Sequence, residues 1–186
     1  MIQLQTERLR LRPFQRDDLD DYARIIADPE VVRYIGNGQP LSREDAWRSM
    51  AMHLGHWQLR GYGMWAVELK ETGRFIGRIG LFFPEGWPGL ELGWLLDRTY
   101  WGQGLAAEGG RAALDFAFQE LQAKHVISII FPENRNSIRV AEKIGERFER
   151  KGTLKGSEVV IYGITAPESS SSNPPQVPAP ISSPQP

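Results

Sequence analysis

Apolar and polar residues alternate near the start of the chain, in residues 8–14. Leu9 and Leu11 fall on one face of an extended segment, and three arginines fall on the other. A period of two is typical of a half-buried strand. Further strand-like runs, bounded by turn residues or continuously apolar, are predicted at residues 63–70, 74–83, 90–97, 125–131, 147–152 and 158–164.

Helical periodicity replaces this alternation in four other segments. Residues 16–26 carry their apolar side chains on one stripe, with acidic residues in the first turn, where the helix dipole favours them. Ser42 and Asp45 form an approximate capping box that opens a helix over 43–60. Two more helices are predicted, one reaching about Gln122 and one over 136–145. The resulting order, β-α-α-β-β-β-α-β-α-β-β, predicts a mixed α/β fold with helices on both faces of the sheet.

The last twenty residues, "PESSSSNPPQVPAPISSPQP", differ in composition from the rest of the chain. They hold seven of the thirteen prolines, six serines and no aromatic residue. Such a segment buries too little apolar surface to offset its ordering entropy, so we expect a disordered tail over 167–186 after one domain over 1–166. A proline-rich docking peptide is the alternative interpretation of this tail.

Composition excludes several classes of function. The absence of cysteine excludes disulfides, thiolate zinc sites and cysteine nucleophiles. A net charge of −1 does not favour binding to nucleic acid or to an anionic membrane. We find no signal peptide or membrane-spanning apolar run, so a cytoplasmic protein is expected. His53 and His56 have helical i, i+3 spacing but no evident third ligand, so no metal site is expected.

The segment "YWGQGLAAEGGRAAL", Tyr100–Leu114, is rich in glycine and alanine where a strand leads into a helix. Free amides at a helix start bind anions, and small residues allow phosphate oxygens to come close. The segment lacks the residues of a Walker loop or a dinucleotide fingerprint. A helix that packs tightly on the sheet through glycine and alanine is the competing interpretation.

With this segment, the chain resembles the GCN5-related N-acetyltransferases (GNAT), in particular their RimJ/RimL-type branch. The likeness covers residues 3–165 and rests on "TERLRLRPFQRDDLDDY", "ADPEVVRYIG", "LELGWLLDRTYWGQGLAAEGGRAAL" and "PENRNSIRVAEKIG". It implies the GNAT fold, a mostly antiparallel mixed sheet of about seven strands, flanked by helices and splayed where acetyl-CoA binds. The family's phosphate signature, Q/R-x-x-G-x-G/A, falls on residues 101–106, with Trp101 departing at its first position.

The resemblance also implies which residues contact acetyl-CoA. The pyrophosphate is assigned to the backbone from Gln103 to Ala107, and a backbone N–H near Leu95 is expected to polarise the thioester carbonyl. Asn134 and Ser137 are expected to contact the pantetheine arm, with helix capping as an alternative or additional role. The full set is Trp94, Leu95, Leu96, Gln103, Gly104, Leu105, Ala106, Ala107, Asn134 and Ser137.

Glu91 is the first candidate for a catalytic base, because it lies on the strand beside the acyl site between Leu90 and Leu92. Partial burial there raises the pKa of a carboxyl group towards a useful range. An exposed strand residue is the alternative, and Glu68 and Glu85 are weaker candidates. The resemblance offers Ser137 as the acid, or as a hydrogen-bond donor to the departing sulfur.

The predicted function is direct acetyl transfer from acetyl-CoA to a primary amine, either a protein N-terminus or a small molecule. A non-catalytic CoA-binding module is the alternative. The acceptor surface is expected from the first two helices and the loop "PEGWPG", with Trp47, Trp57 and Trp87 lining it or building the core. A homodimer is one candidate for the oligomeric state. The sequence "KIGERF" departs from the family's Lys-x-Gly-Phe, which predicts a late or shifted strand after that helix.

Overall fold

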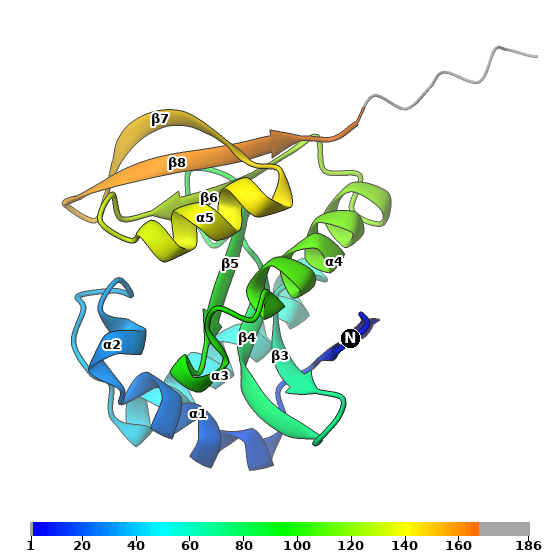
Figure 1. The fold of residues 1–186 in the computed structure, drawn as a ribbon, viewed down its shortest axis with the longest axis vertical. Coiled ribbons are helices and arrows are strands. Elements are labelled where there is room, and N and C mark those ends of the chain that lie inside the picture. Colours follow the sequence, from blue (N-terminus) through cyan, green and yellow to red (C-terminus); the bar gives the residue numbers. More distant parts are fainter. Residues whose placement is uncertain (1, 168–186) are drawn as a thin grey trace, which may run out of the picture.

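The computed structural model describes residues 2–167, which form an eight-stranded mixed sheet with helices on both faces (Figure 1). The strands are β1 Leu4–Gln5, β2 Leu9–Arg12, β3 Met64–Leu69, β4 Arg74–Phe82, β5 Glu91–Leu96, β6 His125–Ile130, β7 Arg147–Leu154 and β8 Ser157–Thr165. The helices are α1 Leu19–Ile26, α2 Pro29–Val32, α3 Arg43–Arg60, α4 Leu105–Gln119 and α5 Arg135–Ile144, with single turns η1 Arg16–Asp18 and η2 Arg98–Tyr100. The predicted tail lies, from residue 168 onward, outside the described residues.

The strands follow the order β1-β2-β3-β4-β5-β6-β8-β7. Every neighbouring pair is antiparallel except β5 and β6, which are parallel and share the single residue pair Glu91–Ile127. The predicted mixed and mostly antiparallel sheet is therefore confirmed, including its splay. The strand beyond the expected seven is β1, whose two residues are too few to show an alternation.

Helices cover the two faces of the sheet unequally. Figure 1 shows α4 crossing one side of the sheet, with α3 fainter behind it, while α5 lies over β6 and β8. Under α4 the core contains Val67, Ile79, Leu92, Leu114 and Phe116. Under α1 and α3 it contains Tyr22, Ile25, Met50, Ala66 and Leu95. The layers follow from the sequence, because successive residues of β3 and β5 point to opposite faces.

The helix ends follow the capping signals, with small differences in length. Ser42 and Asp45 form the predicted capping box of α3, and Gly61 ends that helix in the left-handed conformation with φ 76°. Helix α4 ends at Gln119, before the predicted Gln122. The short helix α2 was not predicted from periodicity. It is started by Asp28, whose side chain accepts a hydrogen bond from the Glu30 N–H, and by proline at the first helical position.

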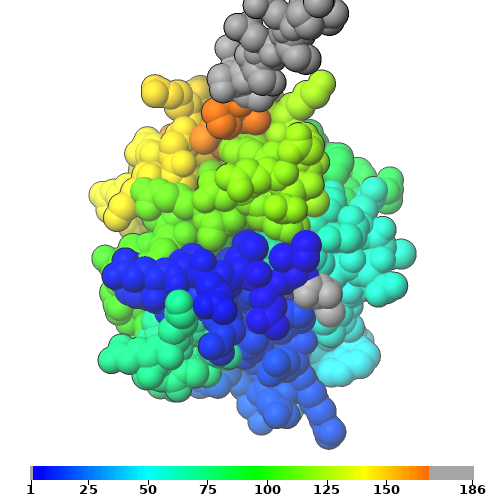
Figure 2. Space-filling model, turned by 90° about the vertical axis from the view of Figure 1, so that its right-hand side faces the viewer, coloured from blue at the N-terminus to red at the C-terminus, as the bar shows by residue number. Residues whose placement is uncertain are grey.

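The three arginines on the polar side of β2 all form ion pairs, and Arg12 is also buried. Arg12 is only 6% exposed and lies 2.8 Å from both Asp18 and Glu68. Arg8 pairs with Glu108 of α4 at 2.6 Å. Figure 2 shows the blue N-terminal segment lying against the green residues of α4, which is the arrangement that this pair stabilises.

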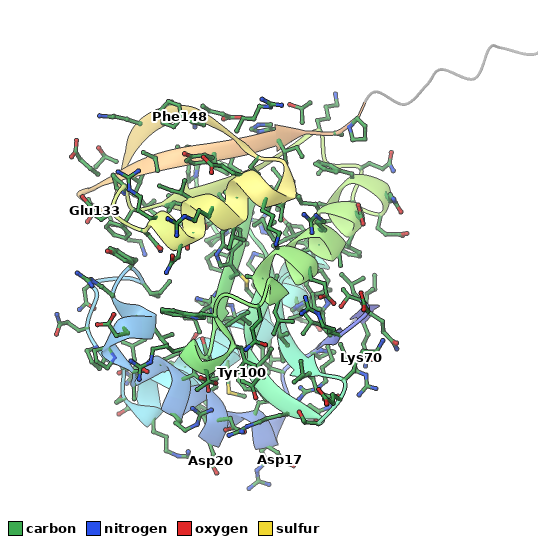
Figure 3. All side chains as sticks on the ribbon, in the orientation of Figure 1. Asp17, Asp20, Lys70, Tyr100, Glu133 and Phe148 are labelled. Carbon is green, nitrogen blue, oxygen red and sulfur yellow. The ribbon has the colours of Figure 1, made fainter. Side chains whose placement is uncertain are left out.

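The turn after α5 confirms the predicted shift in the last part of the sheet. Gly145 ends α5 with φ 102°, and the pairing of β7 with β8 shifts register between Phe148 and Arg150. Phe148, labelled on β7 in Figure 3, is 53% exposed. Glu146 lies where the family motif has phenylalanine, and it is the residue that enters the interior. In residues 2–167, no helix combines the length and apolar character needed to cross a bilayer.

Candidate active site

The parallel strands β5 and β6 separate immediately after their one shared pair. The Ile127 N–H donates to the Leu90 carbonyl at 2.9 Å. A continued parallel ladder would next bring the Ile129 N–H to the Leu92 carbonyl. That carbonyl accepts instead from the Ser128 hydroxyl at 2.9 Å, so a side chain replaces the ladder hydrogen bond. The gap that opens beyond this point is the centre of the candidate site.

The direction of the peptide groups along β5 determines which of them face this gap. The Asp97 N–H donates to Ile76 on the β4 side, whereas the Leu96 carbonyl accepts from the Trp101 indole on the other side. Because peptide directions alternate along a strand, the Leu95 amide points to β4 and the Trp94 peptide group faces the gap. The edge-facing amide is therefore that of Trp94, one residue before the position expected from the sequence.

The start of α4 forms the anion-binding corner of the site. Gly104 precedes the helix with φ 80°. The first helical hydrogen bond runs from the Glu108 N–H to the Gly104 carbonyl. The N–H groups of Leu105, Ala106 and Ala107 consequently lack helical acceptors. All three residues line a cavity of about 800 Å³. Tyr100 and Glu133, both labelled in Figure 3, are among the residues that line this cavity.

Cationic side chains surround the same corner. A Cβ atom at Gly104 would lie 3.5 Å from Lys143 Nζ and 3.8 Å from Arg8 Nη2. Lys143 and Arg139, both on α5, also line the cavity. Positive charge therefore adds to the partial charge of the helix N-terminus, which favours a phosphate-bearing ligand.

The glycine-rich segment serves packing as well as this corner. A Cβ atom at Gly109 would lie 2.6 Å from Ile79 Cδ1, so a larger residue there would force the end of the Ile79 side chain to move, and glycine favours the close approach of α4 to the sheet. Both interpretations of the segment therefore apply, each to different residues. Trp101 ties the loop to the end of β5, because its indole donates to the Leu96 carbonyl at 2.9 Å.

Gln103 takes a different direction from its neighbours. Its side chain donates to the Thr99 carbonyl at 3.2 Å, and its own carbonyl accepts from Arg8 at 3.0 Å. It does not line the 800 Å³ cavity, unlike Gly104 through Ala107. A ligand contact from Gln103 stays a prediction.

Asn134, Ser137 and Trp94 meet across the gap. The Asn134 side chain caps α5 by accepting from the Ser137 N–H at 3.2 Å, so the capping interpretation is confirmed. The Trp94 indole donates to the Ser137 hydroxyl at 3.3 Å. These residues also line a second cavity of about 320 Å³ on the other side of the gap. Leu95 and Leu96, both 5% exposed, line only the larger cavity.

Glu91 lies in this second cavity. The Trp87 indole donates to Glu91 Oε2 at 2.6 Å. Burial raises the pKa of Glu91 to about 7, against the opposing effects of the Trp87 hydrogen bond, the Arg78 charge and the Ile129 amide. A carboxyl group with this pKa can accept a proton near neutral pH and release it again.

The other candidate bases lie elsewhere. Glu68 is held by Arg10 and Arg12 beside β2, and Glu85 pairs with Arg60 at the surface. Neither residue lines the two cavities around the gap. Of the three tryptophans considered for the acceptor surface, Trp87 lines the smaller cavity, Trp57 belongs to the core, and Trp47 is 60% exposed.

The two histidines of α3 differ in their surroundings. Both ring nitrogens of His56 contact backbone groups, the Tyr62 carbonyl at 2.8 Å and the Phe83 N–H at 3.1 Å. Both ring nitrogens of His53 are buried without a hydrogen-bond partner in the part of the chain described here. Burial, together with the charge of Arg78 and the neighbouring His56, holds the pKa of His53 well below its usual value.

Two charged residues near the gap were missed from the sequence. Arg78 lines the Glu91 cavity from the middle of β4, and the only signal was a basic residue inside an otherwise apolar run. Glu146, 2% exposed, lies 3.0 Å from the Ser128 hydroxyl. The sequence signal for Glu146 was its position in "KIGERF", where the family's Lys-x-Gly-Phe motif has phenylalanine.

Comparison with known proteins agrees with this geometry. Residues 8–147 match the family model described as "Acetyltransferase (GNAT) domain". The uncharacterized N-acetyltransferase p20 of Bacillus licheniformis is 31% identical over 160 residues, covering 85% of this chain and 88% of that protein.

Solved structures agree as well. An acetyltransferase from Agrobacterium tumefaciens str. C58 is 35% identical, with a TM-score of 0.79 over 88% of this chain and 94% of that one. RimL is similar in fold, with a TM-score of 0.75 over 89% of this chain and 98% of that one, at 17% identity. Its structure is described as a ribosomal L7/L12 alpha-N-protein acetyltransferase in complex with coenzyme A. The matched family model, these relatives and the splayed sheet together show that the chain belongs to the GNAT acetyltransferase family.

Proposed function

We propose that this protein binds acetyl-CoA in the larger cavity and transfers its acetyl group to a primary amine in the smaller one. The observation that carries the proposal is the connection of two chemically different cavities at one gap. An anion-binding corner lies on one side, and a carboxyl group that titrates near neutral pH lies on the other. Both cavities share the lining residues Tyr34, Ile35, Trp94, Asn134 and Ser137.

The larger cavity offers complementary groups along the length of coenzyme A. Its diphosphate would accept hydrogen bonds from the N–H groups of Leu105, Ala106 and Ala107, with Lys143 adding positive charge. A pantetheine amide N–H would donate to the Trp94 carbonyl, as an added strand pairs with a free sheet edge. The Asn134 amide nitrogen is available as a further donor, because only its oxygen serves the cap.

The gap suits the thioester carbonyl. In the transfer, negative charge develops on the carbonyl oxygen as the amine adds to the carbon. A fixed backbone N–H aimed at that oxygen is the commonest stabilising device for such a charge. The Trp94 N–H faces the gap and is the donor that we assign to this role.

Glu91 is the proposed base. A primary ammonium must lose a proton before its nitrogen can attack the thioester carbon. Glu91 would take that proton and later release it to solvent. The C–N bond would form and the C–S bond would break, and the second proton lost by the nitrogen would end on the departing sulfur. The products are the N-acetylated amine and the thiol of coenzyme A. The net reaction needs no oxidant, reductant or metal ion.

Ser137 is the proposed donor to the leaving sulfur. Its hydroxyl oxygen accepts the Trp94 indole N–H, which leaves its own hydrogen free to donate. A serine hydroxyl is a weak acid, so the role is stabilisation of the departing thiolate by a hydrogen bond. Burial at the gap strengthens this hydrogen bond relative to one in water.

Calorimetric titration with coenzyme A and initial-rate assays with a panel of amines test this function. The native chain should bind coenzyme A and acetylate at least one class of amine. Ala106→Asp, which adds negative charge at the helix start, should weaken coenzyme A binding by about tenfold or more. Gln119→Asp at the other end of the same helix is the matched control and should bind normally.

Two results would overturn the proposal in different ways. If coenzyme A releases no heat and protects no backbone amide of α4 from hydrogen exchange, the cofactor assignment is wrong. If coenzyme A binds but no amine is acetylated across the panel, the chain is a coenzyme A-binding module and the assigned chemistry is wrong.

A further inference from the structure

Arg78 lies in the acceptor cavity without a carboxylate partner. Its side chain lines the 320 Å³ cavity together with Glu91. Within residues 2–167, no carboxylate oxygen lies within 4.0 Å of its guanidinium nitrogens. Arg12, the other arginine in the interior of the sheet, has two such partners at 2.8 Å. Arg78 is partly buried in the middle of β4, and a charged group in such a place is usually paired, so its lack of a carboxylate partner is notable.

The guanidinium is held in a fixed orientation. Its Nε donates to the Tyr22 hydroxyl at 3.2 Å, and this hydroxyl is itself 3.0 Å from Ser49 Oγ. Its Nη1 contacts only the Met64 sulfur, at 3.6 Å, which is a weak acceptor. Its Nη2 donates to no group in the described part of the chain. One side of the guanidinium is thus anchored, and the outer nitrogens are left for a ligand.

The described groups around this positive charge offset it only in part. His53, packed beside the cavity, is buried with both ring nitrogens unpartnered, and its lowered pKa keeps it neutral. Lys155 also lines the cavity, with its Nζ 5.3 Å from the centre of the Trp87 ring. Among the lining residues that the structure describes, Glu91 is the single acid, against the two bases Arg78 and Lys155.

Glu91 on β5 and Arg78 on β4 lie on the same face of the sheet, two rows of residue pairs apart. Glu91 is paired with Phe82 and Arg78 with Leu95, so their rows lie four residues, or about 13 Å, apart along β4. Gly80 and Gly93 form the row between them and add no side chain, while the Met64 methyl group lies over Gly93. The guanidinium is near enough to lower the pKa of Glu91 electrostatically. The base and the cation therefore face one short space.

We propose that the acceptor is a small primary amine that also carries a carboxylate, with its amine at Glu91 and its carboxylate on the Arg78 guanidinium. The inference rests on the proposed function and names the substrate class of that site. Arginine recognises a carboxylate through parallel hydrogen bonds, and the free outer nitrogens of Arg78 have this capacity. A cavity of about 320 Å³ suits a small molecule. The N-terminus of a polypeptide has an amide where such a substrate has its carboxylate.

Matched pairs of amino acids and their carboxamides test the proposal. The α-amine of a carboxamide loses its proton more readily, so intrinsic reactivity favours the carboxamide. We nevertheless expect kcat/KM to be about tenfold to a hundredfold higher for the carboxylate. In Arg78→Met this ratio should fall to about one or below, with Arg78→Lys intermediate because one ammonium replaces the fork of donors. Arg48→Met, an exposed arginine of α3, is the control that should keep the native ratio.

Binding measured without turnover separates failure of this inference from failure of the proposed function. N-acetylated amino acids and their carboxamides are titrated into the native protein and Arg78→Met in the presence of coenzyme A. Tighter binding of the carboxylate, lost in Arg78→Met, supports the substrate class even if no amine is acetylated. Equal binding of both, or faster acetylation of carboxamides and peptide N-termini by the native protein, overturns it. Unchanged melting temperatures and coenzyme A affinity exclude misfolding of the variants.

Discussion

The Ser128 hydroxyl lies 3.0 Å from Glu146 Oε1 and 2.9 Å from the Leu92 carbonyl. A hydroxyl has one hydrogen, and a carbonyl can only accept. If Ser128 donates to Leu92, then Glu146 must donate to Ser128, which requires a protonated carboxyl group. Burial raises the pKa of Glu146 to about 8, and the charges of Glu91 and Glu149 add to this effect. A protonated Glu146 therefore fits the position of Ser128, the residue whose hydroxyl replaces the ladder hydrogen bond at the splay.

Glu146 should make stability fall as pH rises. Its pKa in the folded state, about 8, exceeds its unfolded value of 4.5, so between these values the folded protein binds more protons. The free energy of unfolding should therefore decrease across this window, by about 4 kcal/mol for this group once pH exceeds 8. Glu146→Gln removes the titration while keeping a hydrogen-bond donor.

Urea unfolding from about pH 5 to about pH 8.5 measures this effect. The native protein should lose stability on going to the higher pH, and Glu146→Gln should lose distinctly less. The pKa of Glu91 is also raised in the folded protein, so its titration lowers stability with rising pH as well and leaves a smaller pH slope in Glu146→Gln. Glu120→Gln at the exposed end of α4 is the control. An identical pH slope in native protein and Glu146→Gln would contradict a protonated Glu146.

Glu91 should control the pH dependence of the reaction. Its carboxyl group is deprotonated, and able to act as a base, above its pKa of about 7. We expect kcat to rise with pH through this region for an amine that binds as its ammonium form. Glu91→Gln should lower kcat by about a hundredfold or more and remove the inflection. Glu85→Gln, in which an exposed surface carboxyl is lost, is the matched control. Retention of the inflection in Glu91→Gln would assign it to another group.

Gly104 should be essential for the anion-binding corner. Its φ of 80° is strained for any residue with a Cβ, at a cost of about 1–2 kcal/mol. A Cβ there would make only an ordinary contact with Lys143 Nζ, at 3.5 Å, but it would lie in the corner proposed for the phosphates. Gly104→Ala should therefore lower both stability and coenzyme A affinity. Gly73→Ala is the control for backbone strain alone. Gly73 has φ 68° in the β3–β4 turn, and a Cβ atom there would have no heavy atom within 4 Å. If calorimetry finds equal coenzyme A affinity in both variants, Gly104 has only a conformational role.

Much of the fold could be predicted because local signals and burial agree. Ser42 and Asp45 form the capping box that their spacing predicted, and Gly145 ends α5 as expected. The two-residue strand β1 and the one-turn helix α2 were not predicted, since neither is long enough to show a period. Their formation depends on neighbours that are distant in sequence.

The sequence indicates the part of the candidate site that is formed by backbone groups. It indicates less of the part where side chains from distant strands converge. The strand-to-helix position of Gly104, Ala106 and Ala107 is visible in sequence as a run of small residues. The direction of the Trp94 peptide group depends on pairing with β4, which the sequence does not display. Arg78 becomes notable only when the strand register brings it into one cavity with Glu91.

Arg12 should contribute strongly to stability because two carboxylates depend on it. It lies 2.8 Å from Asp18 and 2.8 Å from Glu68, and it is 6% exposed. Arg12→Met preserves much of the side-chain volume but leaves both acids without this cation, so we expect a loss of about 3–5 kcal/mol. Arg74→Met, at the exposed start of β4, is the control and should change stability by about 0.5 kcal/mol or less. Adding Asp18→Asn to Arg12→Met should restore part of the loss, because it removes one unpaired charge. Urea unfolding measures these variants together with Asp18→Asn alone, and an additive double variant would mean that Arg12 acts through packing alone.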